Sequence, residues 1–220
     1  MKITVDLLDG WEACGEGIYL FKEIYPKGEA DLLEVLTFKY EDKPNYKQNQ
    51  IKRYQNWIIC SLIRNNLPIP EGVTEIGVLD LEGYKFPLPN SIISTDDLYL
   101  EDYKFPLPNS IKEIGDYNFY KYKFPLPNSI IETGILSLED HGFALPNSII
   151  KTGGLVLEGY EFSLPDSIKE TGYIYLYGYK FSLPNSIIKT GTIYLGDYKL
   201  PIPEHLKQFV FKEKTNESYS

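Results

Sequence analysis

A proline recurs every 19 residues along about the last two thirds of this chain. The eight copies follow one another with no insertion or deletion: Pro70, Pro89, Pro108, Pro127, Pro146, Pro165, Pro184 and Pro203. With this proline as position 3 of the repeat, residues 68–200 form seven full repeats, and a partial eighth begins at Pro201. The consensus is P-L-P-N-S-I-I-K-T-G-x-L-x-L-E-G-Y-K-F. Self-similarity at a fixed period indicates a repeat architecture, in which each unit packs on its neighbours.

Positions 6, 12, 14 and 19 of the repeat are apolar in every copy. The alternation at positions 12 and 14 is typical of a strand with one buried face. Apolar residues at constant spacing line up in columns only if each repeat forms one turn of a coil, stacked on the turn of the preceding repeat. The strands of successive repeats then form a parallel sheet with rungs about 4.8 Å apart.

The other positions supply the corners of the coil. Glycine at position 10 in six repeats allows a positive φ or a close backbone approach. The Leu-Pro-Asn-Ser-Ile segment predicts an extended stretch entering a turn or short 3₁₀ coil. We therefore predict a mainly β fold: a single parallel-sheet solenoid, right-handed by the general rule for parallel crossovers, with an α-helical N-terminal cap.

The repeats resemble leucine-rich repeats. Residues 190–200, Thr-Gly-Thr-Ile-Tyr-Leu-Gly-Asp-Tyr-Lys-Leu, overlay the strand and turn of the L-x-x-L-x-L-x-x-N-x-L motif. The short, proline-rich coil is most similar to FNIP-type repeats and to arrays in bacterial and phage proteins. The resemblance covers residues 67–211, but tyrosines, and His141 in one copy, stand where the family has an asparagine ladder. A stacked aromatic column is the expected substitute.

Residues 1–66 are expected to form a helical module that caps the first repeat. Leu7, Trp11, Cys14, Ile18 and Phe21 are spaced as on one amphipathic helix over 4–24, and further helices are predicted over 29–38 and 46–64. The Cys14–Phe21 pattern resembles the leader module of some bacterial and phage arrays, so a binding role for this module stays open.

The C-terminal segment is expected to close the solenoid. Leu206, Phe209 and Phe211 continue the register with different chemistry, and the polar residues 212–220 are predicted to be disordered. We therefore divide the chain into three parts: a helical module over 1–66, the repeats with a closing coil over 67–211, and a tail over 212–220. Distinct caps at both ends favour a monomer.

The net charge of −9 lies almost wholly in the repeats. Residues 1–66 hold 9 basic and 10 acidic residues, whereas 67–220 hold 13 basic and 21 acidic ones. This argues against direct binding of nucleic acid or an anionic membrane and favours a partner with a basic surface. Cys14 and Cys60 are expected to be buried cytosolic thiols, and the N-terminus has no secretory signal, so we expect a cytoplasmic protein.

No catalytic constellation is recognisable in the sequence. His141 and His205 fall in different coils about three rungs apart, which disfavours a shared metal ion. The Asn-Ser pairs and glycines recur at the repeat period, as structural residues do. We expect neither an enzyme nor a cofactor.

Positions 11, 13 and 15 are predicted to point outward from the sheet. They hold the candidate partner-binding residues Asp80, Glu82, Asp97, Tyr99, Glu101, Asp116, Tyr120, Glu139, Glu158, Tyr173, Tyr175, Tyr177 and Tyr194. Carboxylates dominate the first three repeats and tyrosines the last two, although strand propensity and solubility also favour these residue types.

Three functions remain open on this pattern. The first is a protein–protein interaction solenoid anchored by Tyr173, Tyr175, Tyr177 and Tyr194, because tyrosines often dominate binding energy. The second is a phage or mobile-element inhibitor that mimics nucleic acid and blocks a nucleic-acid enzyme, as in anti-CRISPR or anti-restriction proteins. The third is a purely structural component without a discrete partner.

Overall fold

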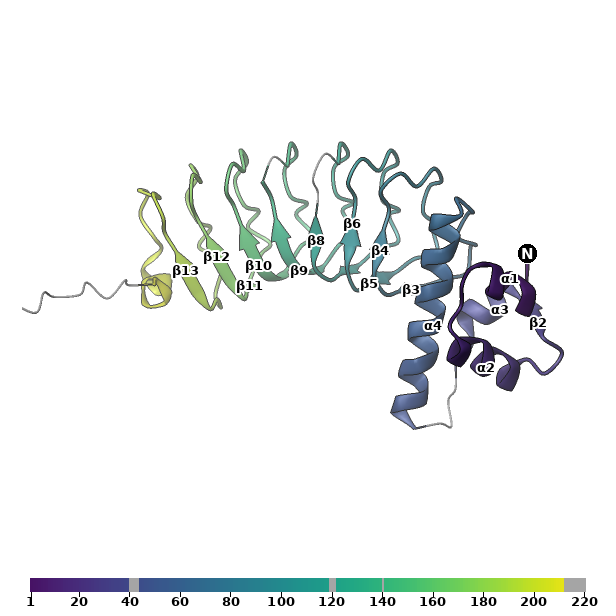
Figure 1. Ribbon diagram of the computed structural model, residues 1–220. Coiled ribbons are helices and arrows are strands. Elements are labelled where there is room, and N and C mark those ends of the chain that lie inside the picture. Colours follow the sequence, from purple (N-terminus) through teal and green to yellow (C-terminus); the bar gives the residue numbers. More distant parts are fainter. Residues whose placement is uncertain (40–43, 119–121, 140, 212–220) are drawn as a thin grey trace, which may run out of the picture.

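The repeats wind into a parallel β-solenoid of about six turns, which confirms the predicted fold class (Figure 1). The computed structural model describes residues 1–39, 44–118, 122–139 and 141–211. Each repeat places its strand residues on the same side of the coil, as one rung of the sheet. We number the rungs from the first repeat (68–86) to the seventh (182–200).

The strands are short and succeed one another at the repeat spacing. They are β3 (Glu75–Ile76), β4 (Leu79–Asp80), β5 (Ser94–Thr95), β6 (Leu98–Tyr99), β7 (Glu113–Ile114), β8 (Tyr117–Asn118), β9 (Glu132–Ser137), β10 (Lys151–Val156), β11 (Glu170–Thr171), β12 (Tyr173–Tyr175) and β13 (Thr192–Tyr194). Each residue pairs in parallel with the one 19 positions on, for example Leu155 with Ile174 and Ile174 with Ile193. The sheet register is therefore the sequence repeat itself.

The core consists of the apolar columns inside the coil. Leu98 and Leu100, at positions 12 and 14, are fully buried, as is Ile92 at position 6. Position 19 is only half-buried: Phe105 leans against Tyr103 of its own repeat with ring centroids 5.6 Å apart. The predicted column at position 19 therefore forms at the edge of the core.

Glycine occupies position 10 in every repeat except the second, which has Asp96, because successive backbones approach closely there. A Cβ on Gly172 would collide with the carbonyl oxygen of Gly153, and one on Gly191 with that of Gly172. A left-handed φ is found instead at position 16, for example 69° at Gly83. Of the two roles predicted for the position-10 glycine, close approach is the correct one.

The tyrosines at position 17 form the predicted stacked column. Tyr179 stacks on Tyr160 and on Tyr198, with ring centroids 6.4 Å apart in both pairs. His141 occupies one place in the column and stacks on Tyr160 at 6.4 Å. Tyr84 and Tyr103 stack in the same way in the first two repeats, so aromatic stacking recurs along the solenoid.

The tyrosine hydroxyls also bond the backbone at the preceding corner of the coil. The Tyr103 hydroxyl accepts a hydrogen bond from the Leu88 N–H (2.9 Å) and donates one to the Phe86 carbonyl (3.0 Å). The same pair of bonds recurs at Tyr84, Tyr122, Tyr160 and Tyr179. The hydroxyls thus satisfy buried backbone groups that would otherwise lack partners.

The N-terminal module comprises β1 (Lys2–Thr4), α1 (Val5–Gly10), α2 (Gly15–Ile24), β2 (Glu29–Asp31), α3 (Leu32–Thr37) and α4 (Asn45–Arg64). The prediction of one helix over 4–24 is wrong. Glu12 adopts a φ of 63° and ends α1, with the Ala13 N–H bonded to the Leu8 carbonyl at 2.9 Å, as in a Schellman motif. The antiparallel pair of β1 with β2 is not predicted, whereas α4 agrees with the helix expected over 46–64.

Helix α4 lies across the N-terminal end of the solenoid (Figure 1). Ile58, Ile59 and Leu62 are buried in the core that the module shares with the first repeats. The Asn56 side chain lies against Gly77 of the first rung. The end of the sheet is therefore covered, as the cap hypothesis requires.

The prediction of two buried thiols is wrong. Cys14 is exposed and Cys60 is half-buried, and both are free. Cys14 stands at the N-cap position of α2, outside its buried face. Cys60 lies at the rim of the interface with the first rung, near the Val78 carbonyl.

The C-terminal segment closes the other end. The 3₁₀ helix η1 (Glu204–Phe209) buries Leu206 fully, and Val210 bridges Ile193 of β13 in parallel. The predicted disordered tail, 212–220, lies outside the described residues. No helix in the described part of the chain is long and apolar enough to cross a membrane.

Candidate functional site

Positions 11, 13 and 15 of the seven rungs form one outward surface, which we call the strand face. Tyr99, Tyr175 and Tyr177 are 44%, 41% and 56% exposed, and Tyr173 and Tyr194 are half-buried. Its carboxylates are exposed or half-buried: Asp80, Glu82, Asp97, Glu101, Asp116, Glu139 and Glu158. Tyr120, the remaining candidate, lies outside the described residues.

The strand face changes in character along the solenoid. Its first rungs carry most of the carboxylates. The fourth and fifth rungs present short or apolar residues, namely Ile135, Ser137, Gly154 and Val156. The sixth and seventh carry the tyrosines. The structure thus spreads the described candidate residues along one surface, with Glu139 and Glu158 on the middle rungs, rather than gathering them in a single cluster.

The tyrosine end is one contiguous aromatic cluster. Tyr175 and Tyr194 stack with ring centroids 4.3 Å apart and an interplanar angle of 6°. Tyr173 meets Tyr175 edge-on at 5.4 Å, and Phe211 contacts Tyr194 at 5.4 Å. Sequence reasoning missed Phe211 as a member, because the closing segment brings it beside β13 only through the Ile193–Val210 bridge.

Tyr173 reaches back over the fifth rung because Gly154 has no side chain. A Cβ on Gly154 would meet the Tyr173 ring within 3 Å. Partial burial, and then the Asp116 carboxylate, raise the pKa of Tyr173. Partial desolvation and the neighbouring Tyr194 raise the pKa of Tyr175. Both phenols therefore stay neutral at physiological pH. The Gly153-Gly154 pair is the sequence signal that could have revealed this arrangement.

Two of the predicted carboxylates also support the backbone. An Asp80 carboxylate oxygen accepts a hydrogen bond from the Glu82 N–H at 3.1 Å, and one of Asp116 accepts from the Ile135 N–H at 2.8 Å. Asp80 and Asp116 therefore have a structural role besides their contribution to surface charge.

No lysine or arginine occurs at any position of the strand face. The lysines of the repeats stand elsewhere. At position 8, for example, Lys151 pairs with Glu132 and Lys189 with Glu170, each at 3.0 Å. Positions 11, 13 and 15 therefore include seven carboxylates and no basic residue, a regularity that the sequence reasoning overlooked.

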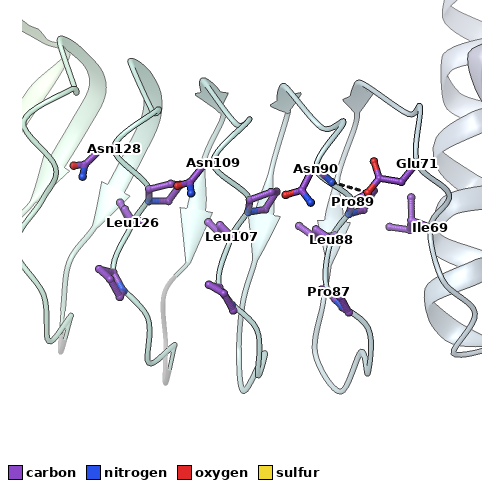
Figure 2. A pocket seen from close by; sticks show the side chains of 14 residues that line it. Ile69, Glu71, Pro87, Leu88, Pro89, Asn90, Leu107, Asn109, Leu126 and Asn128 are labelled. Carbon is purple, nitrogen blue, oxygen red and sulfur yellow. Dashed lines mark hydrogen bonds between the residues drawn. The ribbon is translucent and has the colours of Figure 1, made fainter.

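Two grooves lie outside the strand face. A groove of about 600 Å³ runs over three successive Pro-Leu-Pro-Asn segments, where the side chains of Asn90, Asn109 and Asn128 stand in a row beside prolines (Figure 2). A second, of about 700 Å³, lies between α4 and the first rungs and mixes Lys52 and Arg53 with Glu75 and Asp96. The first groove has Glu71 as its one charged lining residue, and the second has charges of both signs, so neither has the row of carboxylates found on the strand face.

Within the described ranges, no three His, Cys, Asp or Glu side chains group as metal ligands would. Burial lowers the pKa of His141 to about 4, so its ring is neutral at physiological pH, whereas His205 bonds the Ile187 carbonyl at the far end. No protein family, curated protein or solved structure matches this chain. The residues of the strand face are therefore the structural basis for a functional assignment.

Proposed function

We propose that this protein is a non-enzymatic interaction solenoid whose strand face binds a protein partner with a basic surface. The observation that carries the proposal is the charge segregation of the repeats: the strand face has seven carboxylates and no lysine or arginine. A surface of one sign attracts an oppositely charged partner and speeds the encounter.

The aromatic cluster supports the same assignment. Tyr175 on β12 and Tyr177 in the turn that follows this strand both keep large exposed areas. Exposed tyrosines are typical of binding hot spots, where large rigid rings contribute much of the affinity. The carboxylates then steer the partner, and the aromatic end holds it.

The test is an affinity pull-down in which the intact protein is the bait, and it compares two matched triple variants. One carries Asp80→Asn, Asp97→Asn and Tyr175→Leu on the strand face. The other carries Asn90→Ala, Asn109→Ala and Asn128→Ala in the proline-lined groove. The proposal predicts a captured partner that is lost by the strand-face variant and kept by the groove variant. The opposite result would move the binding surface to the groove and refute the proposal.

A second candidate is a nucleic-acid mimic that blocks a nucleic-acid enzyme, such as a phage or mobile-element inhibitor. It is favoured by the same cation-free face, because aligned carboxylates can occupy a basic nucleic-acid channel. In that case the captured partner is a nucleic-acid enzyme, and added DNA or RNA releases it from the bait. A partner insensitive to nucleic acid would exclude this candidate.

A further inference from the structure

Among the described residues, the Tyr175 ring at the aromatic end of the strand face is stacked on another ring on one side only. Tyr194 covers that side, since the two rings are nearly parallel with centroids 4.3 Å apart. The other side is directed to the fifth rung, where the register partner of Tyr175 is Val156. Val156 is much shorter than tyrosine, and Tyr175 remains 41% exposed.

Other groups lie around this second side of the Tyr175 ring. Tyr173 stands edge-on to Tyr175 on the side of position 11. Glu158, two residues beyond Val156, stands on the side of position 15 and is exposed. Among the described residues, no lysine or arginine forms an ion pair with Glu158. By the register of the rungs, the Tyr175 ring, the short Val156 side chain and the exposed Glu158 carboxylate are therefore neighbours on the strand face.

These three groups complement the parts of an arginine side chain. A planar guanidinium stacks on an aromatic face and pairs with a carboxylate, while its aliphatic stem packs on apolar atoms. A lysine ammonium is a compact, strongly hydrated charge and gains less from a flat ring.

We propose that the protein partner inserts an arginine side chain between Tyr175 and Glu158, above Val156. This inference rests on the proposed function and names the group that the aromatic end recognises. Tyr175 supplies the stacking surface, Glu158 the countercharge, and Tyr173 closes the site on its other flank. The carboxylates of the first three rungs attract the remaining basic residues of the partner without distinguishing arginine from lysine.

The test uses the full-length protein and two capped hexapeptides of equal charge, one alternating glycine with arginine and the other glycine with lysine. Their dissociation constants are measured by NMR titration of ¹³C-labelled tyrosines at one low ionic strength. We expect the arginine peptide to bind about fivefold more tightly, the size of an exposed cation–π contact. The largest shifts are expected at Tyr175.

Three variants assign the preference to this site. Tyr175→Leu is expected to equalise the two affinities, and Glu158→Gln to weaken both peptides while the arginine preference persists. Tyr19→Leu, which removes an exposed tyrosine of α2, is the matched control and is expected to change neither. Circular dichroism melts check that each variant keeps its fold.

Equal affinities for the two peptides, or an arginine preference that survives Tyr175→Leu, would overturn the inference. Either result would leave the proposed function standing, because attraction of a basic partner requires only the charge of the strand face. Loss of binding in the groove variant alone would refute the proposed function itself.

Discussion

At the scale of single residues, the tyrosine hydroxyls at position 17 account for much of the regularity of this solenoid. A phenol of this column fills the core and bonds two backbone groups of the preceding corner. Burial raises the pKa of Tyr103, so its hydroxyl remains protonated and able to donate to the Phe86 carbonyl. A side chain of the same shape without the hydroxyl would leave a buried N–H and a buried carbonyl without this partner.

Replacing Tyr103 by phenylalanine is therefore expected to lower the free energy of unfolding by about 1–3 kcal/mol, the cost of leaving buried polar groups unsatisfied. Urea denaturation measures the loss. Tyr99→Phe on the exposed strand face of the same rung is the control, with an expected change below about 0.5 kcal/mol. Equal stability of the two variants would show that the hydroxyl groups of the tyrosine column do not contribute to stability and that only the packing of its rings does.

His141 makes the same column sensitive to acid. Burial lowers the pKa of this ring to about 4, whereas an unfolded histidine titrates near 6.5. Between these pH values the unfolded chain binds a proton that the folded chain does not. The stability is therefore complete above pH 6.5 and is lost as the pH falls toward 4.

From pH 7 to pH 5 we expect the free energy of unfolding to fall by about 2 kcal/mol through this residue. His141→Tyr should remove that part of the pH dependence. Urea titrations at both pH values measure the free energy of unfolding. His205→Asn is the control and should retain the pH dependence of the wild type. A wild-type protein as stable at pH 5 as at pH 7 would contradict the burial of a neutral imidazole.

At the scale of the elements, the spacing of the rungs depends on glycine at position 10. The carbonyl of the preceding rung occupies the space that a Cβ on Gly172 would need. Any side chain there pushes two rungs apart and strains the hydrogen bonds between them.

Gly172→Ala is accordingly expected to destabilise the protein by more than about 2 kcal/mol, at the upper end for point mutations. Gly142→Ala is the control, because a Cβ at Gly142 meets no atom within 4 Å. Thermal melts of the two variants compare them directly. If both variants had the melting temperature of the wild type, the close approach of the backbones would not restrict the residue at position 172.

The elements also show what could and could not be predicted from the sequence. The strands at positions 12 and 14, the tyrosine column and the closing coil follow from the repeat, because seven copies average out local ambiguity. The N-terminal module has no repeat, and its helical periodicity from Leu7 to Phe21 concealed the break at Glu12. That break depends on a left-handed residue other than glycine, which residue type alone does not indicate.

For the candidate site, the sequence predicted which residues share a surface but not how their side chains pack against one another. Periodicity placed Tyr173, Tyr175 and Tyr194 on one surface. Their stacking, the reach of Tyr173 over Gly154 and the arrival of Phe211 depend on side-chain directions and on the fold of the closing segment. Such contacts are properties of the packed rungs and not of the spacing along the chain.

At the scale of the whole molecule, the residues that hold the solenoid together are separate from most of those that line the strand face. The apolar and tyrosine columns inside the coil hold each rung on the next, while α4 and η1 cover the two ends. Most positions of the strand face vary from rung to rung while the coil stays regular. Carboxylates prevail on its first rungs and tyrosines on its last two, on one regular sheet.

The central claim, that the strand face is the partner-binding surface, is tested most directly by site-specific photo-crosslinking of the full-length protein. The photoreactive amino acid p-benzoylphenylalanine replaces Tyr175 or Tyr99 on the strand face, and Asn109 in the proline-lined groove as the control. Irradiation with the captured partner should yield adducts from positions 175 and 99 and none from position 109. Adducts from position 109 alone would contradict the account.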